Sequence, residues 1–229
     1  MTTLTAIDPT TGAVVREVPA TTPQEITTII DRSHEAYTTW KDTSVAERAE
    51  VLRRVATYMR EHTEELAPLM TEEMGKPLGE ARGEVAKSAW AAEHYADHAA
   101  EYLADEHLDS DAASSYVQYL PLGPVLGILP WNAPFWVAFR FCAPALMAGN
   151  TCVMKHDPHV PGCAAALEEV FRAAGAPEGI FQTLLAVTED VEQAIRDPRI
   201  RAVSFTGSDR AGATVASIAA SEIKPAVLE

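Results

Sequence analysis

One charged side chain stands alone in a long uncharged stretch of the sequence. Arg140 is the only charged residue between Ala112 and Met154. Burying an unpaired guanidinium costs so much free energy that Arg140 must either meet an anion or reach solvent. Two interpretations follow. Arg140 forms a structural ion pair with one of the many carboxylates of the chain, or it binds the carboxylate of a substrate.

Asn132 is a candidate hydrogen-bond donor for a reacting oxygen atom. It follows the apolar run 125–129, in the segment Pro130-Trp131-Asn132-Ala133-Pro134, where two prolines restrict the turn. If the run forms a parallel strand, Asn132 lies at the carboxyl edge of a sheet, where α/β proteins bind ligands. There its side-chain amide could donate to a developing oxyanion. Asparagine is also a common turn former, so a purely structural role stays open.

Two further features lie at predicted strand ends. Lys155 follows the apolar run 151–154, and the turn Gly207-Ser208 follows the run 202–205. Backbone N–H groups at the start of a helix after Gly207 can receive a phosphate. The glycines are too few for the dinucleotide fingerprint, and no Lys-Ser or Lys-Thr pair completes a Walker loop. Taken alone, Lys155 is better explained as a solvated lysine.

The histidines and cysteines do not predict a metal or nucleophilic centre. His94 and His98 have the i, i+4 spacing of a zinc-binding pair, but the sequence near them provides no third ligand. Cys142, Cys152 and Cys163 lie in apolar segments, which predicts small buried residues and not nucleophiles. We therefore expect no metal. Three cysteines in 229 residues also argue against a disulfide framework and indicate a reducing compartment.

The first hundred residues have the pattern of amphipathic helices. Thr22 to Glu25 and Ser44 to Glu47 both form capping boxes, and apolar residues at helical spacing follow each. Gly75-Lys76-Pro77 ends a further helix, and alanines from Ala81 to Ala96 line a long one. We expect these helical surfaces to serve packing.

The rest of the sequence predicts an arm and then an α/β domain. Residues 105–111 are acidic, and residues 116–120 alternate like a strand with one polar face. From residue 125 onward, apolar runs alternate with helical segments, which is typical of a parallel sheet with helices on both faces. Segment 121–139 contains four prolines and two glycines, so we expect buried strand and loop there and not a membrane helix. The expected strands are 125–129, 151–154, 181–185, 202–205 and 226–228, and the expected helices are 161–174, 188–196 and the segment after Gly207.

The composition excludes several classes of partner. The formal net charge is -15 at pH 7, and the sequence pI is about 4.8. Such a chain repels the phosphate backbone of nucleic acids and anionic lipid, so we expect neither a nucleic-acid nor a membrane partner. The first residues lack the basic and apolar pattern of a secretory signal, and we expect a cytoplasmic protein.

Several motifs in order resemble the aldehyde dehydrogenase superfamily, and among its members the NAD(P)-dependent succinate-semialdehyde dehydrogenases. The motifs are Glu73-Met74-Gly75-Lys76-Pro77, residues 121–134, residues 144–155, Phe205-Thr206-Gly207-Ser208 and Val227-Leu228-Glu229. The resemblance covers the whole chain and implies a Rossmann-like α/β fold in three parts. These parts are an N-terminal helical part of the cofactor domain over 1–104, an oligomerisation arm over 105–122 and a dinucleotide-binding core over 123–229. It also implies a homo-oligomer.

The resemblance implies chemical roles for three residues. Asn132 matches the oxyanion-hole asparagine, and Glu229 matches the glutamate that activates water for thioester hydrolysis. Arg140 matches the arginine with which succinate-semialdehyde dehydrogenases bind the substrate carboxylate.

The resemblance also implies contacts with NAD or NADP. Trp131 lines the nicotinamide side, Lys155 contacts the adenosine ribose, and the turn Gly207-Ser208 meets the pyrophosphate. Pro158 stands where a carboxylate would select the free ribose hydroxyl, so we expect both cofactors to be accepted. Lys155 and His156 are then the expected partners of a ribose phosphate.

The function expected from the resemblance is oxidation of an aldehyde, succinate semialdehyde, to its carboxylate through a cysteine thioester. In the family the nucleophilic cysteine follows the position of Glu229, so we expect the catalytic cysteine domain to be absent from residues 1–229 and this chain alone to be inactive. The alternative is a noncatalytic dinucleotide-binding or assembly fragment. An acyl-phosphate reductase of the same superfamily is disfavoured, because such an enzyme does not need Glu229 to hydrolyse a thioester.

Overall fold

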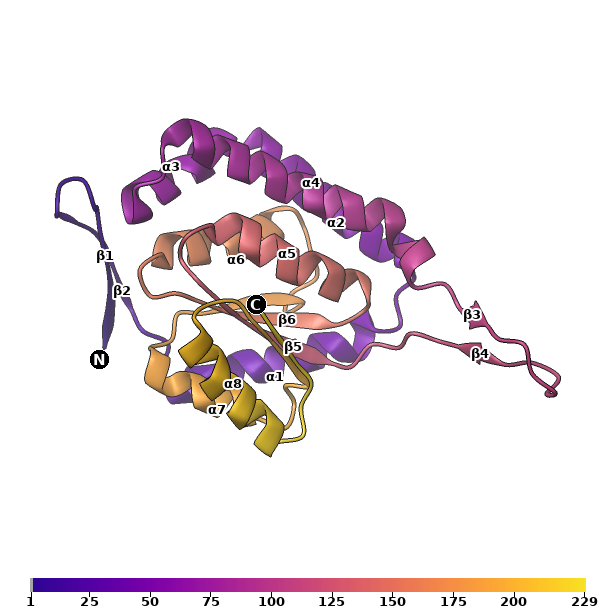
Figure 1. The fold of residues 1–229 in the computed structure, drawn as a ribbon. Helices are drawn as coiled ribbons and strands as arrows, with labels where there is room; N and C mark the ends of the chain where they lie inside the picture. Colours follow the sequence, from indigo (N-terminus) through magenta and orange to yellow (C-terminus); the bar gives the residue numbers. More distant parts are fainter. Residues whose placement is uncertain (1) are drawn as a thin grey trace.

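The computed structural model describes residues 2–229, and these residues fold around a parallel five-stranded sheet (Figure 1). The strands are β5 (Pro124–Leu129), β6 (Thr151–His156), β7 (Phe181–Leu184), β8 (Ala202–Phe205) and β9 (Ala226–Leu228). Their order in the sheet is β7-β6-β5-β8-β9, so the chain builds outward from β5 first on one side and then on the other. The connections that follow β5 lead to one side of the sheet, and those that follow β7 lead to the other side. The gap between β5 and β8 is therefore the topological switch point of a Rossmann-like sheet. The predicted fold class is confirmed.

Helices cover both faces of the sheet, and a further helical layer lies over one of them (Figure 1). The covering helices are α5 (Pro134–Met147) and α6 (Pro161–Ala173) on one face, and α1 (Pro23–Trp40), α7 (Val191–Arg196) and α8 (Asp209–Ser221) on the other. The outer layer consists of α2 (Val45–Glu61), α3 (Thr63–Met74) and α4 (Leu78–Tyr102). A short 3-10 turn (Thr188–Asp190) precedes α7. The buried apolar residues form two clusters, one on each side of the sheet.

The expected helix starts in the first half are confirmed. Thr22 and Ser44 accept hydrogen bonds from the backbone N–H groups of Glu25 and Glu47, whose carboxylates accept in return from the capping residues. The alanine-lined helix is α4, and its small buried side chains let it pack closely against α2 and α5.

Buried carboxylates replace local caps at the start of the inner helices. Both α5 and α6 begin with a proline and have no capping side chain of their own. Glu73 of α3 is buried and accepts hydrogen bonds from the N–H groups of Gly162 and Cys163, at 2.7 and 2.9 Å. Arg16 pairs with this carboxylate at 2.9 Å. The start of α6 is therefore capped from the outer helical layer.

Two segments differ from the expectation. An antiparallel hairpin of β1 (Thr3–Ile7) and β2 (Val14–Pro19) precedes the first helix, where no strand was expected. The expectation of strand and loop over 121–139 is wrong from Pro134 onward, because α5 begins there. This helix is apolar on nearly all sides, so it has no helical polar pattern, and its first proline occupies a position that helices tolerate. Among residues 2–229, no helix is both long and apolar enough to cross a membrane.

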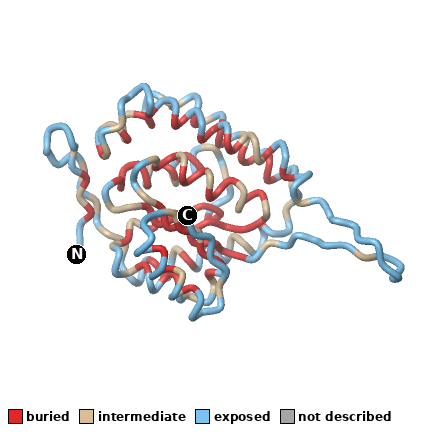
Figure 2. Tube along the Cα trace, in the orientation of Figure 1, coloured by how far each residue is buried: buried red, intermediate tan, exposed pale blue. Residues whose placement is uncertain are grey.

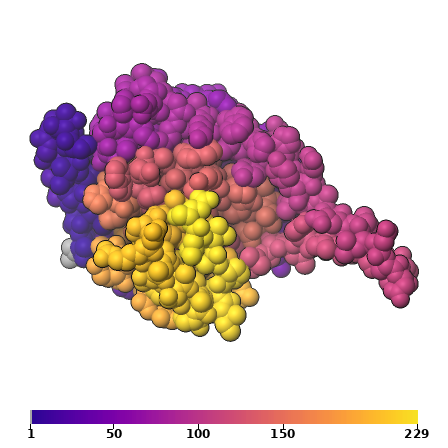
Figure 3. Space-filling view, in the orientation of Figure 1, coloured from indigo at the N-terminus to yellow at the C-terminus, as the bar shows by residue number. Residues whose placement is uncertain are grey.

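The segment between α4 and β5 projects from the rest of the molecule (Figures 1 and 3). It contains β3 (Glu106–His107) and β4 (Tyr116–Val117), which pair antiparallel. Nearly all of this segment is exposed, as Figure 2 shows. The strand is shorter than the predicted 116–120, and the role of the arm in assembly stays a prediction.

Two glycine substitutions should change stability in opposite directions. Gly127 lies in β5 under the ring of Phe141, and an added Cβ would lie 2.5 Å from the Cε1 atom of that ring. Gly83 lies in α4, where an added Cβ meets nothing within 4 Å. We expect Gly127→Ala to lower the free energy of unfolding by about 1 to 3 kcal/mol. Gly83→Ala should raise it by about 0.5 to 1 kcal/mol. Urea denaturation measures both, and a shift of the same sign in the two variants would contradict this packing.

Candidate active site

The sheet register brings four strand ends to one level. Ile128 of β5 pairs with both Lys155 of β6 and Phe205 of β8, and Phe205 pairs in turn with Leu228 of β9. The residues that follow β5, β8 and β9 therefore leave the sheet at the same edge, on both sides of the switch point. This is the edge at which α/β sheets bind ligands.

Arg140 and Glu229 meet at this edge. Arg140 extends from α5, forms an ion pair with the carboxylate of Glu229 and donates from Nη2 to the hydroxyl of Thr206 at 3.2 Å. Its side chain is 38% exposed, so the guanidinium both meets an anion and reaches solvent, as the sequence required. Two candidate residues that are 89 positions apart in the sequence are thus in direct contact.

The turn at Gly207 is closed by the end of β9. The N–H of Gly207 donates to the carbonyl of Glu229 at 3.0 Å, and a Cβ at position 207 would lie 2.6 Å from the ring of Phe205. Ser208 caps α8, because its hydroxyl accepts from the N–H of Ala211 at 3.4 Å. A hollow of about 220 Å³ lies beside this turn. Gly207 therefore lets the ring of Phe205 pack directly against the turn, and the first turn of α8 provides the N–H groups without intrahelical acceptors.

Lys155 is a buried cation at the carboxyl end of β6. The residue is only 5% exposed, and among residues 2–229 no hydrogen bond or ion pair involves its ammonium group. Burial lowers the pKa of Lys155, while the charges of Asp157 and Glu189 act in the opposite direction. A desolvated ammonium of this kind favours a ligand that supplies oxygen atoms.

His156 has a different role from the one expected. Its ring is buried, accepts at Nδ1 from the N–H of Asp157 at 3.1 Å and donates from Nε2 to the carbonyl of Pro134 at 3.0 Å. Burial lowers the pKa of His156 to about 4, so the ring is neutral at pH 7. Because both nitrogens are occupied and the ring is uncharged, the expectation that His156 binds a ribose phosphate is wrong. It fixes the start of α5 to the end of β6.

The turn that carries Trp131 and Asn132 is exposed, but a largely buried lysine holds its backbone. The carbonyl of Asn132 accepts a hydrogen bond from the ammonium of Lys76 at 3.1 Å, and Lys76 forms an ion pair with Glu84. No hydrogen bond within residues 2–229 involves the side-chain amide of Asn132, which is free to donate to a ligand. Trp131 is 45% exposed beside it.

Sequence reasoning missed Lys76 and Glu84 as the side chains that hold this turn, and it gave His156 a different role. A signal for Glu84 was present, because it lies within the helical stripe of buried residues between Ala81 and Ser88. A charged residue in such a stripe must find partners. For His156 no comparable signal exists, because a histidine at the end of a strand is common.

The three thiols of the described chain lie in its interior. Cys142, Cys152 and Cys163 are all buried, as expected. Burial raises the pKa of each thiol, which disfavours the reactive thiolate. Within residues 2–229, no group of three histidine, cysteine or acidic side chains is arranged to hold a metal ion.

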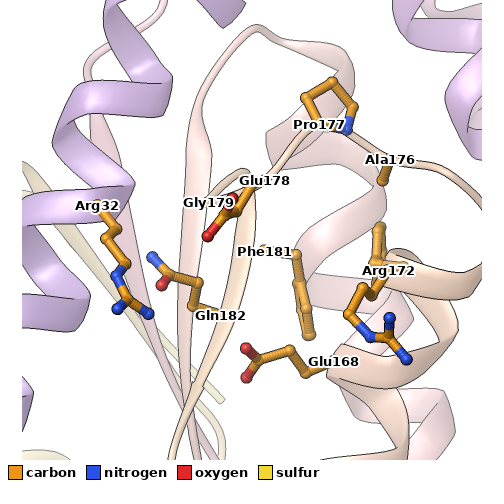
Figure 4. Close-up of a pocket in the computed structure, with 10 residues that line it drawn as sticks. Arg32, Glu168, Arg172, Ala176, Pro177, Glu178, Gly179, Phe181 and Gln182 are labelled. Carbon is orange, nitrogen blue, oxygen red and sulfur yellow. The ribbon is translucent and has the colours of Figure 1, made fainter.

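A hollow of about 330 Å³ lies away from the candidate residues, at the amino end of β7 (Figure 4). Two of its polar side chains, Glu168 and Gln182, already have partners in the fold. Glu168 accepts from the N–H of Thr183 at 2.7 Å, and the amide of Gln182 donates to the carbonyl of Ile29 at 2.8 Å. Burial raises the pKa of Glu168. None of the residues predicted to act on a ligand lines this hollow, so we place the candidate site at the opposite edge of the sheet.

The sheet order and the polar residues at its switch point define a Rossmann-like α/β domain. The sequence model of the aldehyde dehydrogenase family matches residues 1–229, the whole chain. This chain therefore belongs to the aldehyde dehydrogenase family, a family of oxidoreductases, and the resemblance noted in its motifs is confirmed.

Individual relatives agree with this assignment. A probable NADP(+) succinate-semialdehyde dehydrogenase of Synechocystis sp. is 45% identical over 226 residues, which are 99% of this chain and 50% of that protein. An NADP(+) succinate-semialdehyde dehydrogenase of Mycobacterium tuberculosis is 43% identical over 99% of this chain and 50% of its own length. The crystal structure of succinic semialdehyde dehydrogenase from Streptococcus pyogenes with NADP+ matches with a TM-score of 0.95, 34% identity and coverage of 99% and 50%. The chain thus spans about half the length of these relatives.

The buried histidine should make stability depend on pH. Its pKa is about 4 in the folded state and about 6.5 when unfolded, so the unfolded chain binds more protons between these values. The stability that depends on a neutral His156 is fully present above pH 6.5 and is lost as the pH falls toward 4. We expect His156 to account for about 2 to 3 kcal/mol of the decrease in unfolding free energy from pH 7 to pH 4.5. Chemical denaturation of wild type and His156→Gln, which keeps a donor but does not titrate, measures it. Equal losses in both proteins would contradict the assignment.

Proposed function

We propose that this chain is the cofactor-binding half of an enzyme that oxidises succinate semialdehyde to its carboxylate with NAD or NADP. The observation that carries the proposal is the position of Arg140, a lone cation from an uncharged segment, at the switch point beside Thr206 and Glu229. The names of the similar proteins support the substrate class.

Arg140 would bind the distal carboxylate of the substrate. In the structure its guanidinium already pairs with a carboxylate, that of Glu229, and it remains partly exposed. A planar guanidinium suits such a ligand because it can donate two parallel hydrogen bonds. An aldehyde with a carboxylate at its far end could be oriented by this contact, which an uncharged aldehyde could not make.

The reacting end of the substrate would meet Asn132 and Glu229. The free side-chain amide of Asn132 would donate to the oxyanion that forms when a thiolate attacks the aldehyde. Glu229 would accept a proton from the water that hydrolyses the resulting thioester. The buried thiols of this chain are unsuited to the attack, so the reaction takes its nucleophile from outside residues 1–229. A nicotinamide cofactor, when bound, accepts the hydride.

Four residues would hold this cofactor. The buried ammonium of Lys155 fits a ribose or its phosphate, because no group of the described chain occupies it. Ser208 caps α8, whose first N–H groups suit a pyrophosphate, and Gly207 lines the hollow beside this turn. Trp131 would line the nicotinamide side with its exposed ring.

The three-part division would serve assembly. Residues 1–104 would complete the cofactor domain, the arm 105–122 would join copies of the protein, and residues 123–229 would form the dinucleotide-binding core. The arm exposes Tyr116, Val117, Tyr119 and Leu120, an apolar group that a second copy could cover. We infer a homo-oligomer.

A second candidate is a noncatalytic dinucleotide-binding or assembly fragment. The observation that favours it is the burial of all three thiols, because none can form the covalent intermediate. The two candidates share the cofactor site and differ in whether a reactive cysteine reaches it.

Replacing Arg140 tests the substrate class. In the full-length enzyme, Arg140→Ala should raise KM for succinate semialdehyde by about tenfold to a hundredfold, since a charge-assisted hydrogen bond contributes about 1.5 to 3 kcal/mol. An uncharged aldehyde of similar length is the control, and its KM should change little. Steady-state kinetics on both substrates provides the measurement. Equal effects would assign Arg140 a structural role.

Replacing Lys155 tests the cofactor. Pro158 can neither accept from the ribose 2′-hydroxyl nor repel a 2′-phosphate, so wild type should bind both NAD and NADP. Lys155→Met keeps the side-chain volume without the charge, and it should weaken NADP binding by about tenfold and NAD binding less. Titration calorimetry gives the four dissociation constants. A wild-type preference for NAD by several orders of magnitude, or equal losses for both cofactors, would refute the expectation.

A further inference from the structure

A buried ion pair lies directly under the turn that carries Asn132. The side chains of Lys76 and Glu84 are only 13% and 6% exposed and form an ion pair. The other carboxylate oxygen of Glu84 accepts from the N–H groups of Phe135 and Trp136, at 2.9 and 3.1 Å. Lys76 also donates to the carbonyl of Asn132 at 3.1 Å. Within residues 2–229, every hydrogen bond that these two side chains form outside the pair therefore goes to the backbone of residues 132–136.

The other buried carboxylate pair provides a comparison within the same molecule. Glu73 caps α6 just as Glu84 caps α5, and its cation is Arg16. Within residues 2–229, the ion pairs and hydrogen bonds of the Arg16 side chain go only to Glu72 and Glu73, and none goes to a candidate site residue. The cap of α6 thus uses a carboxylate and a cation and nothing more. The hydrogen bond from Lys76 to the Asn132 carbonyl has no counterpart there.

This bond acts on a residue whose own side chain is free. Asn132 is exposed, and its side-chain amide has no partner within residues 2–229. The backbone of Asn132 therefore sets the point from which that amide extends and the rotamers open to it, and Lys76 holds this backbone on one side. Glu84 and His156 fix the following turn through the N–H groups of Phe135 and Trp136 and the carbonyl of Pro134.

We propose that Lys76 and Glu84 are positioning residues for the oxyanion donor Asn132, an inference that rests on the proposed function. The ion pair holds the carbonyl of Asn132, and with it the Cα atom from which the side-chain amide reaches over the sheet edge. Removing the charge of Lys76 leaves the carboxylate of Glu84 buried without its cation and releases the Asn132 backbone. Because donors act best when preorganised, the loss falls on the transition state more than on cofactor binding.

The geometric part can be tested on the chain as it is. The sequence contains only two asparagines, Asn132 and Asn150, so asparagine labelled with carbonyl 13C and amide 15N gives a simple spectrum. Lys76→Met should shift the carbonyl signal of Asn132 and leave that of Asn150 in place. Arg16→Met, the matched control, should shift neither. An unmoved Asn132 signal in Lys76→Met would overturn the inference.

The kinetic part uses the full-length enzyme with succinate semialdehyde and NADP. Lys76→Met should lower kcat by about tenfold to a hundredfold while KM for NADP stays within about twofold. Lys76→Arg keeps the charge and should recover part of the loss, whereas Arg16→Met should leave kcat near wild type. If Lys76→Met does not fold, Lys76→Gln is the substitute, because it keeps a neutral donor to Glu84. It should also lower kcat.

Two outcomes separate this inference from the function on which it rests. If Asn132→Ala leaves kcat unchanged, the proposed role of Asn132 fails. If Asn132→Ala lowers kcat but Lys76→Met does not, only the positioning role fails. The same holds if Arg16→Met lowers kcat as much as Lys76→Met does.

Discussion

Two buried carboxylates join the outer helical layer to the helices that lie on the sheet. Glu73 of α3 caps α6, and Glu84 of α4 caps α5, each from a distant part of the chain. A buried carboxylate without partners costs several kcal/mol, so each position is tolerated only while its N–H donors and its cation are in place. The relative positions of α3, α4, α5 and α6 therefore depend on the few hydrogen bonds and ion pairs of these two carboxylates.

The start of α5 depends most on this constraint. Lys76 and Glu84 reach it from one side, and His156 reaches it from the end of β6. The same helix carries Arg140 toward Thr206 and Glu229. The position of α5 thus decides two things at once, where Asn132 presents its amide and where Arg140 presents its guanidinium.

Charge is distributed unevenly between the candidate site and the rest of the chain. The whole sequence has a net charge of -15, yet the carboxyl edge of the sheet gathers the cations of Lys155, Arg140 and Lys76. In the part of the chain that the structure describes, Arg140 pairs with Glu229 and Lys76 pairs with Glu84, whereas Lys155 forms no ion pair. An unpaired cation of this kind favours an anionic ligand, although the net charge of the chain repels anions.

Local chemistry in the sequence determined the helix starts at Thr22 and Ser44, because each cap depends on residues a few positions apart. The alternation of apolar runs and helical segments from residue 125 onward predicted the parallel strands and the edge at which their ends meet. Only the tertiary structure decided that segment 134–147 is a helix, because an evenly apolar helix has no periodic signal. It also decided which distant groups Glu84 and Arg140 contact, at separations of 51 to 89 positions, because a charge must find some partner but the fold selects which one.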